Sequence, residues 1–409
     1  MKSPEILSPA GNLEKLQFAF AYGADAVYVA GKKFSLRSYA GNLSDEELEE
    51  AVKLTHKNNK KIYVTLNVFP YNDDIEDIEK YLHFLKSLKV DGIIVSDLGV
   101  FSLTRKICPD VPIHISVQAN NLNYMEVETW KKLGAKRVIL SRELPYEDIL
   151  KIRNFVPDVE LEIFVHGAMC MSYSGRCLLS NYLTGRDSNK GECAQSCRWK
   201  YNLVEEKRPG ECFPVFEDSR GTYILNSKDL CVIKSLHKFI GAGIDSFKIE
   251  GRMKSVHYVA VTTSIYKKVR DEYMKNREKY EFKEEYMKEL EKISHRPYIQ
   301  GFYFRENEIK QNYEFSDYVS TFTYAGHVIE DNDRDNMIKI KVKNTFRIDD
   351  EIEFFMPDGN FFTAKVIEIK NSENIDELYA KQDVEYFLKI DKDIKIPEFT
   401  IIRRQKTKE

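Results

Sequence analysis

The sequence lacks the features that would assign it to several large classes of proteins. No apolar stretch reaches the length of about 18 residues that a membrane-spanning helix needs, and the N-terminus lacks the apolar segment of a secretory signal peptide. Lys and Arg number 62 against 65 Asp and Glu, so the net charge of −3 excludes a chain that coats nucleic acid through overall positive charge. We therefore expect a cytoplasmic protein without membrane contact, in which any contact with RNA comes from a local patch.

Several catalytic motifs are also absent. No G-x-G-x-x-G turn follows the first apolar run, which disfavours a dinucleotide-binding fold. The sequence contains neither the H-E-x-x-H motif of zinc peptidases nor the G-x-S-x-G motif of serine hydrolases. The chain therefore shows no visible machinery for peptide hydrolysis.

Cysteine is scarce, with seven residues in 409, but it is unevenly distributed. Six of them lie between residues 170 and 231, in a window rich in Gly, Ser and Arg, and five of these six are the candidate ligands: Cys170, Cys177, Cys193, Cys197 and Cys231. Disulfides are rare in reducing cytosol, and a chain of this length buries an ample core without them, so we interpret the window as a metal site. Cys108 lies far from the window, and both Cys108 and Cys212 are interpreted as ordinary small residues.

The spacing of the clustered cysteines favours an iron–sulfur cluster over zinc. Structural zinc sites normally use cysteine pairs separated by roughly two to four residues, and only Cys193 and Cys197 fit that rule. Ligands scattered over longer loops suit a bulky Fe–S cluster better. The spacing leaves open whether the fourth ligand is Cys197 or Cys231. A nucleophilic cysteine is the alternative. It would need a base such as His166, which lies four residues before Cys170.

The part of the chain before the C-terminal region alternates between helical and strand patterns. Four segments repeat a glycine or short polar turn followed by a buried run, at residues 23–29, 90–95, 134–140 and 243–249. Further strand candidates lie between them, at residues 5–7, 62–66, 113–117 and 161–165. Eight strands that alternate with helices predict an α/β fold. The expected architecture is a (β/α)₈ TIM-like barrel over residues 1–305.

Polar residues follow the predicted strands, where barrels of this class place their active sites. A mouth lined by amides, carboxylates and arginines suits a small anionic ligand, and the substrate-binding candidates are Arg252, Glu250, Gln118 and His166. The cysteine window fills the connection between the seventh and eighth strands, at about residues 166–245. The cysteines should therefore lie over this mouth.

A second domain is expected at the C-terminal end of the chain. Beyond a polar linker at residues 306–312, short alternating strands predict a small all-β barrel over residues 313–409. The expected strands are residues 338–342, 351–355, 362–367 and 399–403, with a hairpin turn at Pro357-Asp358-Gly359. Such a barrel resembles those appended to translation factors, which commonly touch tRNA. The basic segment at residues 403–406 is the candidate RNA contact, and a structural lid is the alternative.

The cysteine window carries a family resemblance. The segment from Glu162 to Ser180, with its core His166-Gly167-Ala168-Met169-Cys170, resembles the signature of the collagenase-like peptidase family. Three further stretches match as closely: LSPAGN at residues 7–12, NSKDLC at residues 226–231 and KIEGRMKS at residues 248–255. The resemblance covers nearly the whole chain and is greatest to the branch of tRNA hydroxylation proteins.

This resemblance implies an RNA-modifying enzyme. Proteins of that branch take part in prephenate-dependent formation of 5-hydroxyuridine at the wobble position of tRNA, without molecular oxygen, and family members carry a [4Fe–4S] cluster. The ligand pattern of one branch selects Cys170, Cys177, Cys193 and Cys231, whereas a sister protein's pattern uses Cys197. The implied partners are tRNA and a small anionic metabolite, prephenate. The alternatives are collagenase-like peptidase activity, hydroxylation of ribosomal RNA or a ubiquinone precursor, and a non-catalytic binding module with a structural metal.

Overall fold

The structure, a computed structural model of the chain, describes residues 2–32, 34, 41–170, 172–175, 177–198, 217–218, 221–222, 228–304, 319–330 and 337–406. Cys212 lies outside these residues, and Cys108 is buried in the core. Among the helices of the described ranges, none is long and apolar enough to cross a membrane.

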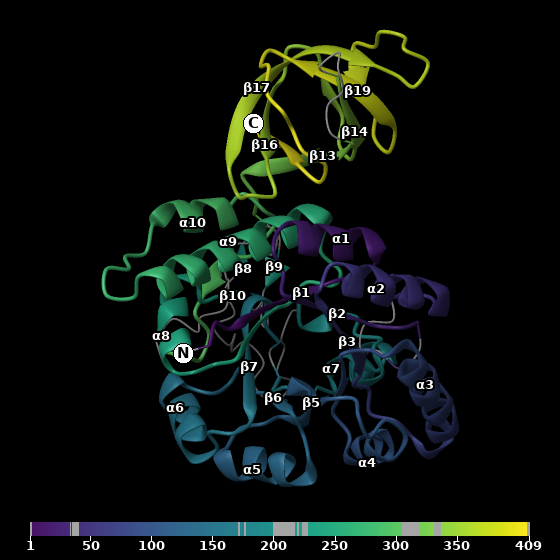
Figure 1. Cartoon of the computed structure of the whole chain (residues 1–409), viewed down its shortest axis with the longest axis vertical. Helices are drawn as coiled ribbons and strands as arrows, with labels where there is room; N and C mark the ends of the chain where they lie inside the picture. The colour runs from purple at the N-terminus through teal and green to yellow at the C-terminus, as the bar shows by residue number, and fades with distance from the viewer. Residues whose placement is uncertain are drawn as a thin grey trace, which may run out of the picture.

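Eight parallel strands close into the larger barrel, which confirms the predicted fold (Figure 1). Each strand pairs with the next in sequence, and β11 closes the barrel by pairing with both β7 and β1. The strands are β1 (Glu5–Pro9), β2 (Ala26–Val29), β3 (Lys61–Leu66), β4 (Gly92–Val95), β5 (Ile113–Ile115), β6 (Arg137–Ile139), β7 (Glu160–Ala168) and β11 (Ser246–Ile249).

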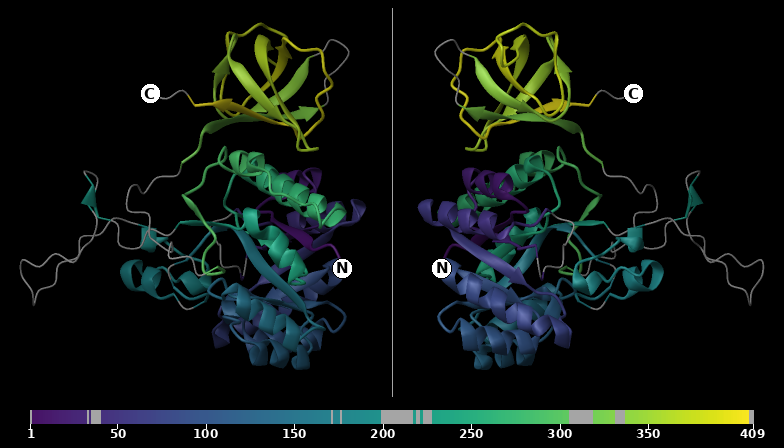
Figure 2. Two further views of the ribbon diagram at one scale, coloured as in Figure 1. Left: turned by 90° about the vertical axis from the view of Figure 1, so that its left-hand side faces the viewer. Right: turned by 90° about the vertical axis from the view of Figure 1, so that its right-hand side faces the viewer.

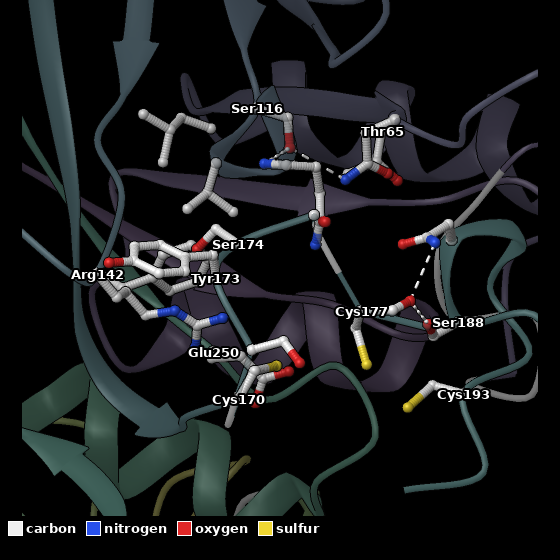
Figure 3. Close-up of a pocket in the computed structure, with 18 of the residues that line it drawn as sticks. Thr65, Ser116, Arg142, Cys170, Tyr173, Ser174, Cys177, Ser188, Cys193 and Glu250 are labelled. Carbon is white, nitrogen blue, oxygen red and sulfur yellow. Dashed lines mark hydrogen bonds between the residues drawn. The ribbon is translucent and has the colours of Figure 1, made fainter. Parts of the chain in front are cut away.

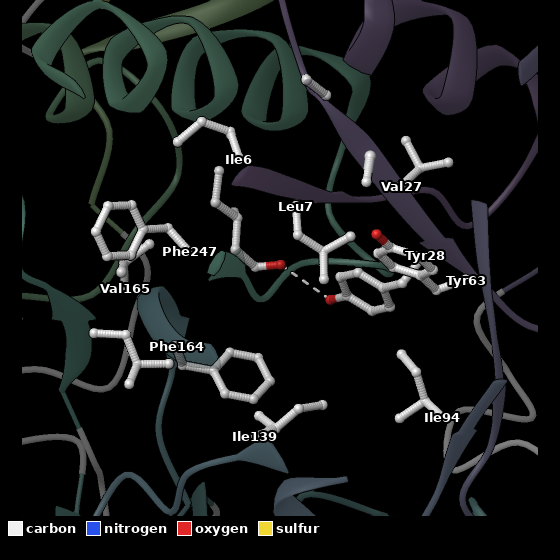
Figure 4. Packing of buried hydrophobic residues seen from close by; sticks show 14 of the residues in the cluster. Ile6, Leu7, Val27, Tyr28, Tyr63, Ile94, Ile139, Phe164, Val165 and Phe247 are labelled. Carbon is white, nitrogen blue, oxygen red and sulfur yellow. Dashed lines mark hydrogen bonds between the residues drawn. The ribbon is translucent and has the colours of Figure 1, made fainter. Parts of the chain in front are cut away.

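A helix follows each barrel strand and covers its outer face. The helices are α1 (Leu13–Ala21), α2 (Asp45–Lys57), α3 (Ile75–Leu88), α4 (Leu98–Ile107), α5 (Tyr124–Leu133), α6 (Tyr146–Phe155), α8 (Leu236–Gly241) and α9 (Val256–Lys275). Side-chain caps start several of them; Ser44 and Glu47, for example, form a capping box at the start of α2. The strands are hydrophobic on both faces, because one face meets the helices and the other fills the barrel interior. Figure 4 shows this interior packing, in which the Tyr28 hydroxyl donates to the carbonyl oxygen of Ile249 at 3.0 Å.

The long connection after β7 adds strands that the sequence analysis did not foresee. Strand β7 runs beyond its pairing with β6, and β10 (Asp229–Cys231) pairs antiparallel with its end, placing Cys231 opposite His166. Strand β12 (Tyr298–Ile299) pairs parallel with β10. The same connection contains α7 (Leu179–Thr184) and the short hairpin of β8 (Glu217–Asp218) and β9 (Gly221–Thr222). Residues 229–231 of the NSKDLC stretch therefore extend the sheet beside the end of β7.

The second domain is a closed antiparallel barrel, as predicted. Its strands are β13 (Phe322–Glu330), β14 (Ile338–Val342), β16 (Glu351–Phe355), β17 (Phe361–Lys370), β19 (Glu385–Ile390) and β20 (Ile401–Gln405), with β15 (Phe346–Arg347) and β18 (Tyr379–Ala380) pairing beside them. Strands β13 and β19 were not predicted. The expected hairpin turn joins β16 to β17, where the Met356 amide donates to the Asn360 carbonyl oxygen at 2.8 Å.

The small barrel packs against α1, α9 and α10 (Glu284–Leu290), as Figures 1 and 2 show. Tyr22, the C-cap residue of α1, is buried there; its ring stacks on Phe355, and its hydroxyl donates to the Phe355 carbonyl oxygen at 2.6 Å. Phe355 and Ile401 belong to the hydrophobic core of the larger barrel. The small barrel is thus held by apolar contact as well as by polar groups.

The expected basic RNA contact at residues 403–406 needs correction, because its first arginine is buried. The Arg403 side chain is 0% exposed and donates to Glu353 and to Glu289 of α10, each at 2.6 Å. Lys292 adds a second cation to Glu353 at 3.0 Å. Arg403 therefore serves to join the two barrels and is not available to phosphate.

Replacing Arg403 by alanine should lower the free energy of unfolding by about 3–5 kcal/mol, because it leaves two buried carboxylates short of a cation. Arg404→Ala is the matched control: its partner is Asp350 at 2.7 Å and its side chain is 40% exposed. The control should cost about 1 kcal/mol or less. Urea unfolding of both variants measures the difference, and equal losses would contradict a joining role for Arg403.

Candidate functional site

The mouth of the larger barrel holds a cavity of about 150 Å³. Its floor consists of inward-pointing strand residues: Tyr28, Thr65, Ile94, Ile139, Phe164 and Lys248. Its sides come from loops that follow the strands: Asn67, Ser116, Gln118, Arg142, Glu250 and Arg252. The segment after β7 forms the rest of the lining. This is the face at which barrels of this class build active sites.

Four cysteines of that segment line the cavity together: Cys170, Cys177, Cys193 and Cys197. Figure 3 shows the sulfur atoms of Cys177 and Cys193 turned toward the same space. An adjoining hollow of about 430 Å³ is also lined by Cys170, Cys193, Cys197 and Glu250. The prediction that the clustered cysteines lie over the barrel mouth is therefore confirmed for these four, and Cys231 does not line the cavity.

Hydrogen bonds to a barrel loop and within the segment hold the cysteine segment in place. The Ser174 amide and hydroxyl donate to Glu143 Oε1 at 3.0 and 3.2 Å. Ser188 and Asn189 donate to the Cys177 carbonyl oxygen at 2.8 and 3.1 Å (Figure 3). The cysteine segment is thus held by polar contacts.

Gly175 allows the segment to approach the loop after β5. Its φ is +75°, and a Cβ added there would lie 2.1 Å from the carbonyl oxygen of Gln118. A side chain at this position would therefore both strain the backbone and push the segment away from the barrel. Glycine at this position sets the relation of Cys170 and Cys177 to the cavity.

If the cysteine segment holds the iron–sulfur cluster that the sequence predicts, Gly175→Ala should lose most of its iron, because backbone strain alone costs about 1–3 kcal/mol and the contact with Gln118 cannot be kept. Gly241→Ala is the control, since a Cβ there meets nothing within 4 Å. Iron content per chain after anaerobic purification measures the effect. Wild-type iron content in Gly175→Ala would show that the close approach does not matter.

Cys231 lies apart from the other clustered cysteines. It is buried on β10, where the Tyr266 hydroxyl donates to its sulfur at 3.7 Å. Burial raises the pKa of its thiol to about 11. Among the described residues, no group of three or more His, Cys, Asp or Glu side chains is placed to hold a metal ion. This holds for the four mouth cysteines as well, so the ligand choice depends on the cavity lining, which includes Cys197 and not Cys231.

His166 is also separate from the cavity. It is buried on β7 among the rings of Tyr258, Tyr266 and Tyr298, with centroid distances of 5.2 to 5.7 Å. Burial lowers its pKa to about 3, so the imidazole is neutral at physiological pH. The structure therefore does not place His166 with the other predicted substrate-binding residues, because its ring is buried and does not line the cavity.

The other predicted substrate-binding residues do come together. Gln118, Glu250 and Arg252 all line the mouth cavity, and Arg252 is 5% exposed. Arg142 joins them; it donates to the Ala168 carbonyl oxygen at 2.6 Å, and its guanidinium lies 4.8 Å from the Phe164 ring centroid. Two arginines beside one carboxylate favour an anionic ligand.

A buried charge network beneath the cavity was missed by the sequence analysis. Lys248 donates to Glu162 at 3.0 Å, and Arg137 donates to the same carboxylate at 2.9 Å. Arg137 is further held by Glu5 at 2.7 Å and Glu160 at 2.8 Å. Burial lowers the pKa of Lys248, and the nearby charges of Arg137 and Arg252 lower it further, against the opposing effect of Glu162. The sequence did carry a signal for this network: one charged residue lies within each of two apolar strands, Glu162 in β7 and Lys248 in β11.

The fold and this mouth define a (β/α)₈ enzyme-like protein with a thiol-lined site. Residues 11–313 match the family described as Peptidase family U32, and residues 320–403 match the Peptidase family U32 C-terminal domain. The chain therefore belongs to peptidase family U32, and the predicted resemblance is confirmed.

Individual relatives share most of the chain. A tRNA hydroxylation protein of Bacillus subtilis is 40% identical over 410 residues, covering 99% of this chain and 96% of that protein. A tRNA hydroxylation protein of Escherichia coli is 39% identical over 409 residues, covering 90% of each. A 23S rRNA 5-hydroxycytidine synthase of Escherichia coli is 34% identical over 273 residues, which cover 67% of this chain and 40% of that protein.

Proposed function

We propose that this protein is a tRNA-modifying enzyme that takes part in the oxygen-independent, prephenate-dependent formation of 5-hydroxyuridine at the wobble position. The similarity to tRNA hydroxylation proteins over nearly the whole chain supports the reaction class. The observation that carries the proposal is the mouth cavity, where four cysteines and two arginines line one space.

The cysteines would hold a [4Fe–4S] cluster. Such a cluster takes four thiolates, and Cys170, Cys177, Cys193 and Cys197 supply that number from one cavity. The segment that carries them is tied to a barrel loop by the hydrogen bond of Ser174 to Glu143, and metal binding can draw such loops together because the binding free energy contributes to folding. We therefore propose Cys197 as the fourth ligand, in place of the Cys231 that the resemblance selects. When bound, the cluster would supply electron transfer or substrate activation.

The side chains around the cavity fit a small anionic co-substrate and a base. Arg252 and Arg142 can bind carboxylates through paired N–H donors. Gln118 and Asn67 offer amide donors and acceptors, the groups that read the edge of an unpaired base. Glu250 lines both the cavity and the adjoining hollow, so it can accept a hydrogen bond from a ligand in either.

Peptide hydrolysis is less well supported by the same site. A cysteine nucleophile needs a base beside it, and no histidine is among the described residues that line the cavity. The neutral, buried His166 cannot serve from its place on β7.

Mass spectrometry of nucleosides tests the proposal. An Escherichia coli strain that lacks its own tRNA hydroxylation activity should regain 5-hydroxyuridine derivatives in tRNA when this chain is expressed. Removing prephenate synthesis from that strain should abolish the gain. Restoration of a hydroxylated nucleoside in ribosomal RNA alone would favour the rRNA alternative, and no change in either RNA would overturn the proposal.

A further inference from the structure

Lys248 is a buried cation in the floor of the mouth cavity, and its surroundings are unusual for a structural residue. It is 4% exposed, and its amino nitrogen lies 4.4 Å from the ring centroid of Tyr28 and 5.6 Å from that of Phe164. All three residues line the cavity. The amine thus stands at the end of β11, on the face where these barrels carry out chemistry.

Stability gives a weak reason for a lysine at this position. Glu162 already accepts from Arg137, and buried ion pairs contribute little net stability against their desolvation cost. The network does, however, fix the Glu162 carboxylate 3.0 Å from the amine, with Arg137 tied in turn to Glu5 and Glu160. The amine therefore has a positioned proton acceptor at hydrogen-bond distance.

Burial of Lys248 favours the neutral, nucleophilic amine. Burial lowers the pKa of Lys248 and outweighs the charge and hydrogen bond of Glu162, which raise it, while the cations Arg137 and Arg252 lower it further. Desolvation and a neighbouring cation are the two general means of activating a lysine for attack on a carbonyl carbon. Arg252 and Arg142 line the same cavity and can hold a carboxylate next to that carbonyl group.

We propose that Lys248 forms an imine with a 2-oxo acid bound in the mouth cavity, its carboxylate held by Arg252 or Arg142 and its proton taken up by Glu162. The ammonium gives one proton to the Glu162 carboxylate, and the neutral amine adds to the carbonyl carbon to form a carbinolamine. Glu162 then returns the proton to the departing hydroxyl, so that one water leaves and a protonated imine remains. No electrons are gained or lost. The inference rests on the proposed function in one respect: prephenate, its co-substrate, is itself a 2-oxo acid.

Reductive trapping tests the imine in the full-length, anaerobically purified protein. Pyruvate is the probe, cyanoborohydride fixes any imine as a stable secondary amine, and peptide mass spectrometry locates it. The expected result is one adduct per chain on Lys248, at least tenfold more abundant than on any other lysine. Acetate has a carboxylate but no ketone group, so it should give no adduct. Adducts spread over surface lysines, or no adduct on Lys248, would overturn the inference.

Two variants separate this outcome from the fate of the proposed function. Lys248→Arg keeps a cation beside Glu162 but cannot form an imine. Lys248→Met replaces the lysine side chain with an apolar side chain of similar length. Both should lose the trapped adduct and tRNA hydroxylation while keeping iron content. If the unmodified protein hydroxylated tRNA but gave no Lys248 adduct, the imine would be refuted and the proposed function would stand. If it gave the adduct but hydroxylated no RNA, the imine would stand and the proposed function would be refuted.

Discussion

Cys197→Ser should abolish the bound iron of the anaerobically purified protein, whereas Cys231→Ser should keep it. A cluster with three thiolates instead of four is lost or degraded, and Cys197 shares its cavity with Cys170, Cys177 and Cys193. Cys231 is instead buried on β10 under the Tyr266 hydroxyl. The expected difference is close to the full iron content of the wild type.

Iron and acid-labile sulfide per chain measure this difference. Serine variants of Cys170, Cys177 and Cys193 should behave like Cys197→Ser, and Cys108→Ser is a control for removal of a buried thiol away from the mouth. If Cys231→Ser lost its iron and Cys197→Ser retained it, the ligand set selected by the family resemblance would be correct and the one proposed from the structure wrong.

Arg252→Lys should lose hydroxylation by tenfold to a hundredfold while keeping its iron and its fold. An ammonium group lacks the planar pair of donors that binds a carboxylate, and a charge-assisted hydrogen bond contributes about 1.5–3 kcal/mol, where about 1.4 kcal/mol corresponds to tenfold. Arg252 is 5% exposed and lines the mouth cavity, so water compensates poorly for the lost contact.

The fraction of hydroxylated tRNA nucleosides measures the loss, with thermal unfolding and iron content as checks. Arg277→Lys, at an exposed position beyond the end of α9, makes the same chemical change on the surface and should retain full activity. Unchanged hydroxylation in Arg252→Lys would remove this residue from the substrate site.

The sequence predicted the larger barrel because its signal is local and repeated. Each glycine or polar turn before an apolar run marks the passage from a helix to a strand, and β2, β4, β6 and β11 all follow such a turn. Strand β10 had no comparable signal: it is short, and its pairing with the end of β7 depends on where a long connection returns. Strand β13 carries Gly326 in its middle, which weakens the alternating pattern.

The site was predicted in part for the same reason. Positions directly after the strands, such as Gln118 and Arg252, reach the mouth in any barrel, whereas the placement of residues within the long connection depends on its path. Cys231 and His166 lie on paired strands whose side chains enter the core, and the alternation of a strand decides that outcome. Lys248 was overlooked because a charged residue within an apolar strand normally counts against burial.

The most direct test of the account compares Cys197→Ser and Cys231→Ser by mass spectrometry of tRNA nucleosides from a host without its own hydroxylation activity. The account predicts that 5-hydroxyuridine derivatives disappear with Cys197→Ser and persist with Cys231→Ser, because only the former thiol lines the mouth cavity. Persistence of the modification in Cys197→Ser would contradict the proposal that the four cysteines at the barrel mouth hold the cluster on which RNA hydroxylation depends.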